Sequence, residues 1–160
     1  MLAQLQFPLA AAAMLAAALA GSGFALFALA PSALAAEQVV YIQGGLALGG
    51  YDPVSYHTDG KPTRGQPEFE TEWMGARWRF ASAEHMTTFR SDPERYAPAY
   101  GGYCAYAVSQ GSLQPGDPKI WRIVDDKLYL NLSPSTQSKW EADIPGSLAR
   151  AEQKWPELTE

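Results

Sequence analysis

The sequence is poor in cysteine, with Cys104 as the only one among 160 residues. A single cysteine excludes a disulfide framework within the chain and excludes the paired-cysteine zinc signatures. The fold must therefore be held by an apolar core, to which five Trp, eight Tyr and six Phe residues contribute large side chains. The one unpaired thiol is either a small buried apolar group or a reactive one.

Clusters of positive charge are also missing. No run of five or more Lys and Arg residues occurs, and 12 Lys and Arg stand against 17 Asp and Glu, for a net charge of -5. We therefore expect no nucleic-acid partner. The sequence also lacks a Ser-His-Asp or Cys-His arrangement in a recognisable context, a phosphate-binding glycine loop and an HExxH motif. These absences favour a non-enzymatic role.

Charged side chains are absent from residues 7–36, a stretch dominated by Ala and Leu. Its tail, Ala33-Leu34-Ala35, has the small-x-small pattern that predicts signal-peptide cleavage after the second alanine. The apolar run is longer than a usual signal peptide and no Lys or Arg precedes it, so an uncleaved membrane anchor is the alternative. We expect residues 1–35 to be a signal peptide or N-terminal anchor. Residues 36–160 then form a single domain, exported to the periplasm or anchored facing it.

Turn and capping signals divide the remaining chain into short elements. A short strand is expected at 39–42, and alternation of apolar and polar residues predicts two β-hairpins, 69–73 with 77–80 and 120–124 with 127–132. Asp-Pro, Ser-Pro and serine caps predict helices from Asp52-Pro53, over 82–90, from Asp92-Pro93, over 133–142 and over 144–155. The predicted fold class is α+β, with a small antiparallel sheet of two hairpins and helices packed on one face.

Four motifs, in order along the chain, resemble those of a known family: Gly-Tyr-Asp-Pro-Val at 50–54, Trp-Arg-Phe-Ala-Ser at 78–82, Asp-Pro-Glu-Arg-Tyr at 92–96 and Tyr-Gly-Gly-Tyr-Cys-Ala at 100–105. They resemble an exported subgroup of the YHS-domain proteins, some of which are catalogued as selenoproteins. The resemblance spans roughly residues 46–155. It implies a small α+β module that binds copper or another soft metal.

The chain departs from this family where the metal-binding members usually carry cysteines. Those places are held here by Ser55, Ala81 and, approximately, His85. The resemblance therefore carries the fold, whereas metal binding must depend on Cys104 and the ligands that fold against it.

The position of Cys104 supports two kinds of chemistry. If residues 103–109 form a helix, the break at Gly101-Gly102 places Cys104 in its first turn, where free amides and the helix dipole favour a thiolate. A thiolate binds Cu(I) or Zn(II), and it also reacts with peroxides and disulfides. The alternative is an inert side chain packed between Tyr103 and Ala105.

His57 and His85 are the only histidines, and imidazole is the next natural ligand for a soft or borderline metal. His57 follows a short helix beside a turn, where a solvated loop histidine is expected. His85 lies at the border of the apolar stripe of helix 82–90 and is the better candidate. Asp52 is expected to act as a helix cap.

Three functions remain open from the sequence. The leading hypothesis is an exported domain that binds copper or a similar soft metal, with Cys104 as the thiolate and His85 or His57 completing the site. The second is a thiol redox protein in which Cys104 is oxidised reversibly. The third is a structural or interaction domain without a metal.

Overall fold

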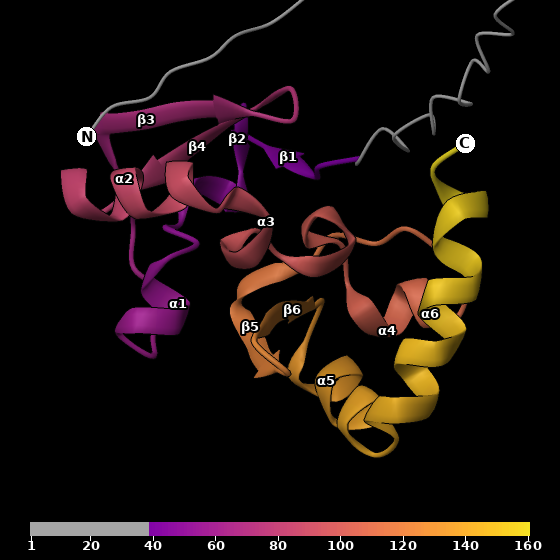
Figure 1. The fold of residues 1–160 in the computed structure, drawn as a ribbon. Coiled ribbons are helices and arrows are strands. Elements are labelled where there is room, and N and C mark those ends of the chain that lie inside the picture. Colours follow the sequence, from indigo (N-terminus) through magenta and orange to yellow (C-terminus); the bar gives the residue numbers. More distant parts are fainter. Residues whose placement is uncertain (1–38) are drawn as a thin grey trace, which may run out of the picture. The chain divides into compact units, whose positions relative to one another are not determined.

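Short helices alternate with three β-hairpins in the computed structural model, which describes residues 39–160 (Figure 1). The strands are β1 (Ile42–Gln43), β2 (Leu46–Ala47), β3 (Gln66–Trp73), β4 (Ala76–Phe80), β5 (Asp117–Val124) and β6 (Lys127–Asn131). The α-helices are α1 (Ser55–Thr58), α2 (Ala83–Ser91), α3 (Pro93–Tyr96), α4 (Ala105–Ser109), α5 (Pro134–Glu141) and α6 (Ile144–Leu158). Two 3-10 helices are η1 (Leu48–Gly50) and η2 (Ala99–Gly102).

The predicted leader, residues 1–35, lies outside the described residues. Within 39–160, no helix has both the length and the apolar character needed to span a bilayer.

Both predicted hairpins are present, and the α+β class is confirmed. The prediction that they share one sheet is wrong, because the described strands form three separate two-stranded antiparallel sheets. The physical reason is that α3 and η2 contact β6 and α3 also contacts α2, so helical segments join the two hairpins in place of a shared strand edge. Pro67 and Pro118 stand at the outer ends of the hairpins, where the pairing register shifts between Gln66 and Glu70 and between Asp117 and Trp121. Proline cannot donate to a strand ladder, and an irregular register bends the strand.

Two-residue turns set the register of both hairpins. Asp125 and Asp126 join β5 to β6 with φ of 49° and 60°, and Met74 and Gly75 join β3 to β4 with φ of 52° and 67°. Positive φ at both central residues is the geometry whose twist matches that of paired strands. The register of each hairpin is therefore set by the conformation of its own two turn residues.

Capping residues start the main helices where the sequence predicts them. The Ser82 hydroxyl accepts the His85 amide at 3.1 Å at the start of α2, and Ser133 forms a capping box with Thr136 at the start of α5. The helix predicted over 144–155 continues to Leu158. The strand expected at 39–42 is reduced to β1, because the Tyr41 amide instead donates to the Gly101 carbonyl at 2.9 Å.

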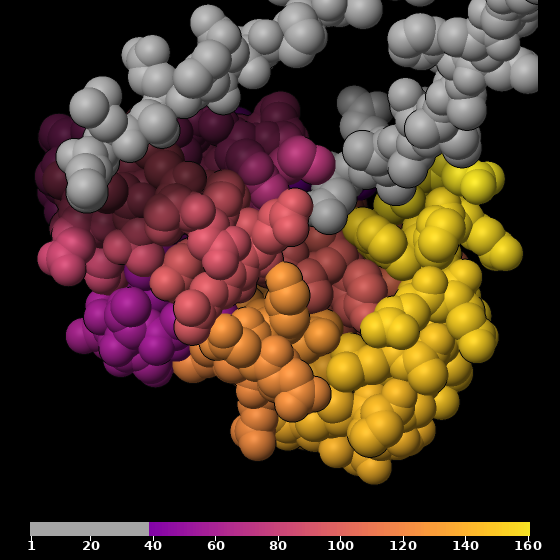
Figure 2. Space-filling view, in the orientation of Figure 1, coloured from indigo at the N-terminus to yellow at the C-terminus, as the bar shows by residue number. Residues whose placement is uncertain are grey.

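Two apolar clusters form the core. The first lies between the β3–β4 hairpin and α2, and its buried members are Ala47, Val54, Ala76, Trp78, Phe80, Phe89 and Ala97. The second lies against the β5–β6 hairpin, and its buried members are Leu48, Tyr51, Tyr56, Leu128 and Leu130. The chain around α3 and η2 passes between the two hairpins (Figures 1 and 2). Leu48, Tyr51 and Tyr56, from the early part of the chain, therefore complete the core beside the β5–β6 hairpin, which comes much later in the sequence.

Tyr56 links α1 to the later hairpin. Its hydroxyl donates to the Pro118 carbonyl at 2.8 Å, and its ring packs edge-on against Trp121 with centroids 5.1 Å apart. On the far side of this hairpin, α4 and α6 run beside each other (Figure 1). The buried residues Val108 and Ala151 come from these two helices.

We predict that Gly101→Ala destabilises the fold more than a matched glycine substitution. Gly101 has φ of +59°, and a Cβ atom there would overlap the carbonyl oxygen of Val39. Gly60 has φ of +64° but no heavy atom near its would-be Cβ, so Gly60→Ala isolates the backbone cost of about 1 kcal/mol. Urea unfolding should show a clearly larger loss for Gly101→Ala. Equal losses would contradict the close packing of residues 39–41 on η2.

Candidate functional site

A buried carboxylate organises the start of α1 and the start of α2. Asp52 is fully buried, and its Oδ1 atom accepts the Val54 amide at 2.8 Å. Its Oδ2 atom accepts the Ala81 amide at 2.8 Å and lies 2.6 Å from Nδ1 of His85. The prediction of Asp52 as a helix cap is wrong in position, because α1 begins at Ser55 with Val54 as its cap residue and Asp52 instead fixes the turn before it. Asp52 also links segments about thirty residues apart in sequence. Hydrogen bonds to a charged group typically contribute about 1.5 to 3 kcal/mol each.

The Asp52 pairing fixes the hydrogen of the His85 ring. An ionised carboxylate can only accept, so we assign the hydrogen between the two residues to Nδ1 of His85. In the neutral imidazole the Nε2 atom then carries a lone pair. The side chain of His85 is 17% exposed. Some side-chain nitrogen and oxygen atoms are buried without a hydrogen-bond partner, but the Nε2 atom of His85 is not one of them. His85 therefore presents an accessible nitrogen lone pair from a fixed ring.

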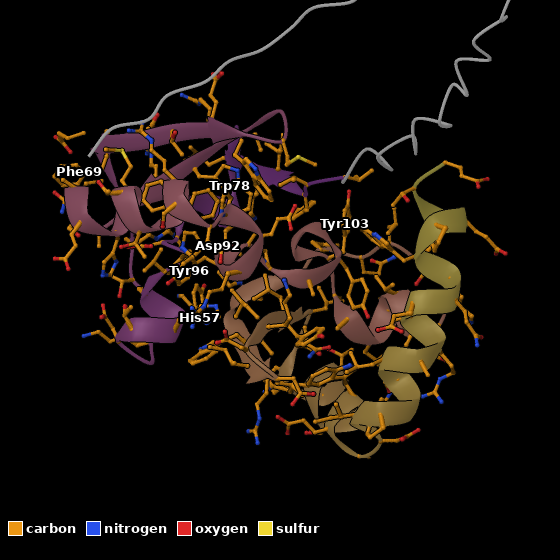
Figure 3. All side chains as sticks on the ribbon, in the orientation of Figure 1. His57, Phe69, Trp78, Asp92, Tyr96 and Tyr103 are labelled. Carbon is orange, nitrogen blue, oxygen red and sulfur yellow. The ribbon has the colours of Figure 1, made fainter. Side chains whose placement is uncertain are left out.

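His57 has a different environment from the one predicted. The prediction that His57 is a solvated loop histidine is wrong, because its side chain is only 7% exposed. The Nδ1 atom lies 3.6 Å from Asp126 Oδ1, and the ring packs edge-on against Tyr96 with centroids 5.3 Å apart (Figure 3). The Nε2 atom is buried without a partner among the described residues. Burial lowers the pKa of His57, and the nearby Asp126 carboxylate opposes this shift only in part.

Cys104 is fully buried at the N-terminal cap of α4, one residue before the helix begins. Its Sγ atom donates to Asn131 Oδ1 at 3.5 Å, and the same oxygen accepts the Tyr106 amide at 3.2 Å. The Cys104 amide donates to the Gln114 carbonyl at 2.8 Å. In this arrangement the sulfur carries its hydrogen and is closed off from solvent, as the inert alternative predicts.

The three predicted ligands thus have three different polar partners: Asn131 for Cys104, Asp52 for His85 and Asp126 for His57. Across residues 39–160, no three His, Cys, Asp or Glu side chains gather in a group that could hold a metal ion. The site best prepared for chemistry is therefore the Asp52–His85 pair.

A comparison with known protein families finds a match in the part of the chain that contains His85. The family model of the YHS domain matches residues 54–100. The chain contains a YHS domain. No curated protein and no solved structure matches the chain. The matched part of the YHS domain includes His57 and His85, whereas Asp52 lies just before it and Cys104 just after it.

The pairing of Asp52 with His85 is the part of the site that the sequence does not reveal. An Asp-Pro step predicts that Asp52 lies near a helix start, and a serine-capped helix explains the position of His85. Only the β3–β4 hairpin, which returns the chain to Ala81, brings the two side chains together. The one usable signal is that His85 lies three residues after its Ser82 cap, in the first turn of α2, near the end of that hairpin.

We predict that protonation of His57 makes the protein less stable in mild acid. Because the pKa of His57 is lowered in the folded state, the unfolded chain takes up the proton first as the pH falls below about 6.5. The free energy of unfolding should therefore fall from pH 7 toward pH 5, and His57→Gln should reduce this slope. Urea unfolding at several pH values measures it, with Gln137→Ala as a control on an unrelated helix. An unchanged slope in His57→Gln would count against the buried imidazole.

Proposed function

We propose that this YHS domain binds a soft or borderline transition-metal ion, copper first, through Nε2 of His85. The observation that carries the proposal is the 2.6 Å contact between Asp52 Oδ2 and His85 Nδ1. A metal-binding histidine typically gives its other ring N–H to a carboxylate or carbonyl, which sets the tautomer and makes the ligand more basic. Among divalent first-row metals, copper binds nitrogen ligands most tightly.

His85 fits this role on three counts. Its ring is fixed by a buried carboxylate, its Nε2 atom is not needed by the fold, and part of its side chain reaches solvent. Asp52 would hold the ring and would not itself be a ligand, because both of its oxygens already accept N–H groups. The remaining coordination positions are left to water or to a donor from a partner molecule. A domain with one prepared ligand suits reversible binding and transfer of an ion.

Cys104 is less suited to act as a metal ligand than the sequence predicts. A thiolate ligand would have to lose its hydrogen, give up the contact with Asn131 and open a buried position. The same burial weakens the redox alternative, because peroxides and disulfides attack an accessible thiolate. We therefore propose that Cys104 is a packing residue of the α4 cap. His57, whose Nε2 atom is enclosed, is likewise given a structural role.

Copper binding by the full-length chain tests the assignment. We expect one Cu(II) ion per chain with imidazole nitrogen coupling in its electron paramagnetic resonance spectrum. His85→Gln should weaken binding by at least about tenfold, and Asp52→Asn by about 10- to 100-fold, because the ring loses its ligand atom or its orienting partner. Circular dichroism checks that each variant is folded.

Two further variants separate this site from the alternatives. His57→Gln and Cys104→Ser should bind copper as the unchanged protein does. Loss of copper binding in Cys104→Ser together with normal binding in His85→Gln would show that the Cys104 thiol, and not His85, binds the metal. Normal binding in all variants would show that copper binds elsewhere.

We also propose that the domain acts outside the cytoplasm. The charge-free stretch 7–36 and the Ala33-Leu34-Ala35 pattern support this placement. We predict that the protein recovered from the periplasm of a bacterial host begins at Ala36, which N-terminal sequencing would reveal. A full-length chain in the membrane fraction would support the anchor, and a full-length chain in the cytosol would contradict export.

A further inference from the structure

A cleft of about 350 Å³ lies away from His85, where α3, η2, the start of β6 and α6 meet. Its volume falls at the lower end of the range for small-molecule sites. Neither predicted histidine nor Cys104 lines it. The cleft therefore needs an explanation separate from the metal proposal.

Aromatic rings form much of the cleft wall. Tyr100, Tyr129 and Trp155 come from three separate elements, and Trp73 also lines the cleft. The centroid of the Tyr100 ring lies 6.0 Å from that of Tyr129 and 5.4 Å from that of Trp155. Aromatic rings gathered beside one small space are the kind of lining that attracts an organic cation.

The charged groups of the cleft favour the same kind of ligand. Glu94 and Glu152 both line it, and neither side chain forms an ion pair with another of the residues in 39–160. The third charged lining residue, Lys127, keeps its positive charge, and its Nζ atom donates to the backbone carbonyl of Glu94 at 2.6 Å. Two carboxylates against one ammonium leave the lining with an excess of one negative charge.

Tyr100 lines the cleft in an unfavourable backbone conformation. Its φ of 53° and ψ of 35° are left-handed, which is uncommon for a bulky residue and persists only where the surrounding packing imposes it. The next residue, Gly101, is fixed by close packing against Val39 and by the Tyr41 amide. Burial, followed by the neighbouring Tyr129 and Glu152, raises the pKa of Tyr100, so its phenol stays uncharged at neutral pH. The packing around Gly101 therefore maintains the strained backbone, and the uncharged ring of Tyr100 lies against Tyr129 and Trp155.

We propose that this cleft binds a small organic cation, a quaternary ammonium or a protonated amine. The aromatic faces contact the cationic head, and Glu94 and Glu152 balance its charge. Binding is reversible, and it does not depend on the metal site proposed at His85.

Choline and its uncharged isostere 3,3-dimethylbutan-1-ol are the probes for this proposal. They have the same shape and differ in charge. Each is titrated into the full-length protein in the presence of EDTA, at constant ionic strength, with tryptophan fluorescence and isothermal calorimetry as readouts. We expect choline to bind at least about threefold more tightly than the alcohol, because only the cation gains from the rings and the carboxylates.

A matched pair of variants on α6 tests the site itself. Glu152→Gln removes a lining carboxylate, whereas Glu157→Gln removes an exposed one outside the lining. We expect choline affinity to fall at least about threefold in the first and to stay unchanged in the second. Both positions are exposed, so both variants should fold. Equal binding of the two probes, equal effects of the two variants, or no choline binding at all would overturn the proposal. Because EDTA removes free metal, none of these outcomes bears on copper binding at His85.

Discussion

The carboxylate of Asp52 is the interaction on which the first half of the fold depends. It is fully buried, and a buried charge is tolerated only when its oxygens are satisfied. The donors come from Val54, Ala81 and His85, so one side chain ties the loop before α1 to the end of the β3–β4 hairpin and the first turn of α2. Each of these contacts removes an unpaired N–H group as well as stabilising the charge. The same bonds that fix the loop also fix the His85 ring, so structure and site cannot be separated here.

Local signals made much of the fold predictable. Alternation of apolar and polar residues identifies both hairpins, and Ser82 and Ser133 mark the starts of α2 and α5. The relation between the hairpins was not predictable, because it depends on α3 and η2 packing against β6 and on residues 39–41 packing against η2. The site shows the same division. The position of His85 at the border of an apolar helix stripe selects it from the sequence, but its partner lies 33 residues earlier and only the folded hairpin joins them.

Cys104 shows why a residue type is a weak guide to chemistry. The glycine pair before it does place the cysteine at a helix start, as expected, but α4 begins one residue later and the side chain turns into the core. Its partner Asn131 lies 27 residues further along the chain, at the end of β6. The Asn131 amide oxygen serves the thiol and the Tyr106 amide together. A sequence pattern can place a backbone, whereas the accessibility of a thiol depends on what a distant strand packs against it.

The matched YHS segment does not close its own core. The first apolar cluster lies almost wholly around residues 54–100, but Tyr56, inside that segment, is buried against Leu128 and Leu130 of β6 and donates its hydroxyl to Pro118. Without the β5–β6 hairpin, this tyrosine would expose its ring and leave its hydroxyl without a protein partner. Truncation at the end of the matched segment would therefore remove one wall of the protein interior as well as Tyr129 and Trp155 from the cleft. The residues that follow the YHS match are thus part of the same folding unit, and they supply part of the aromatic wall of the cleft.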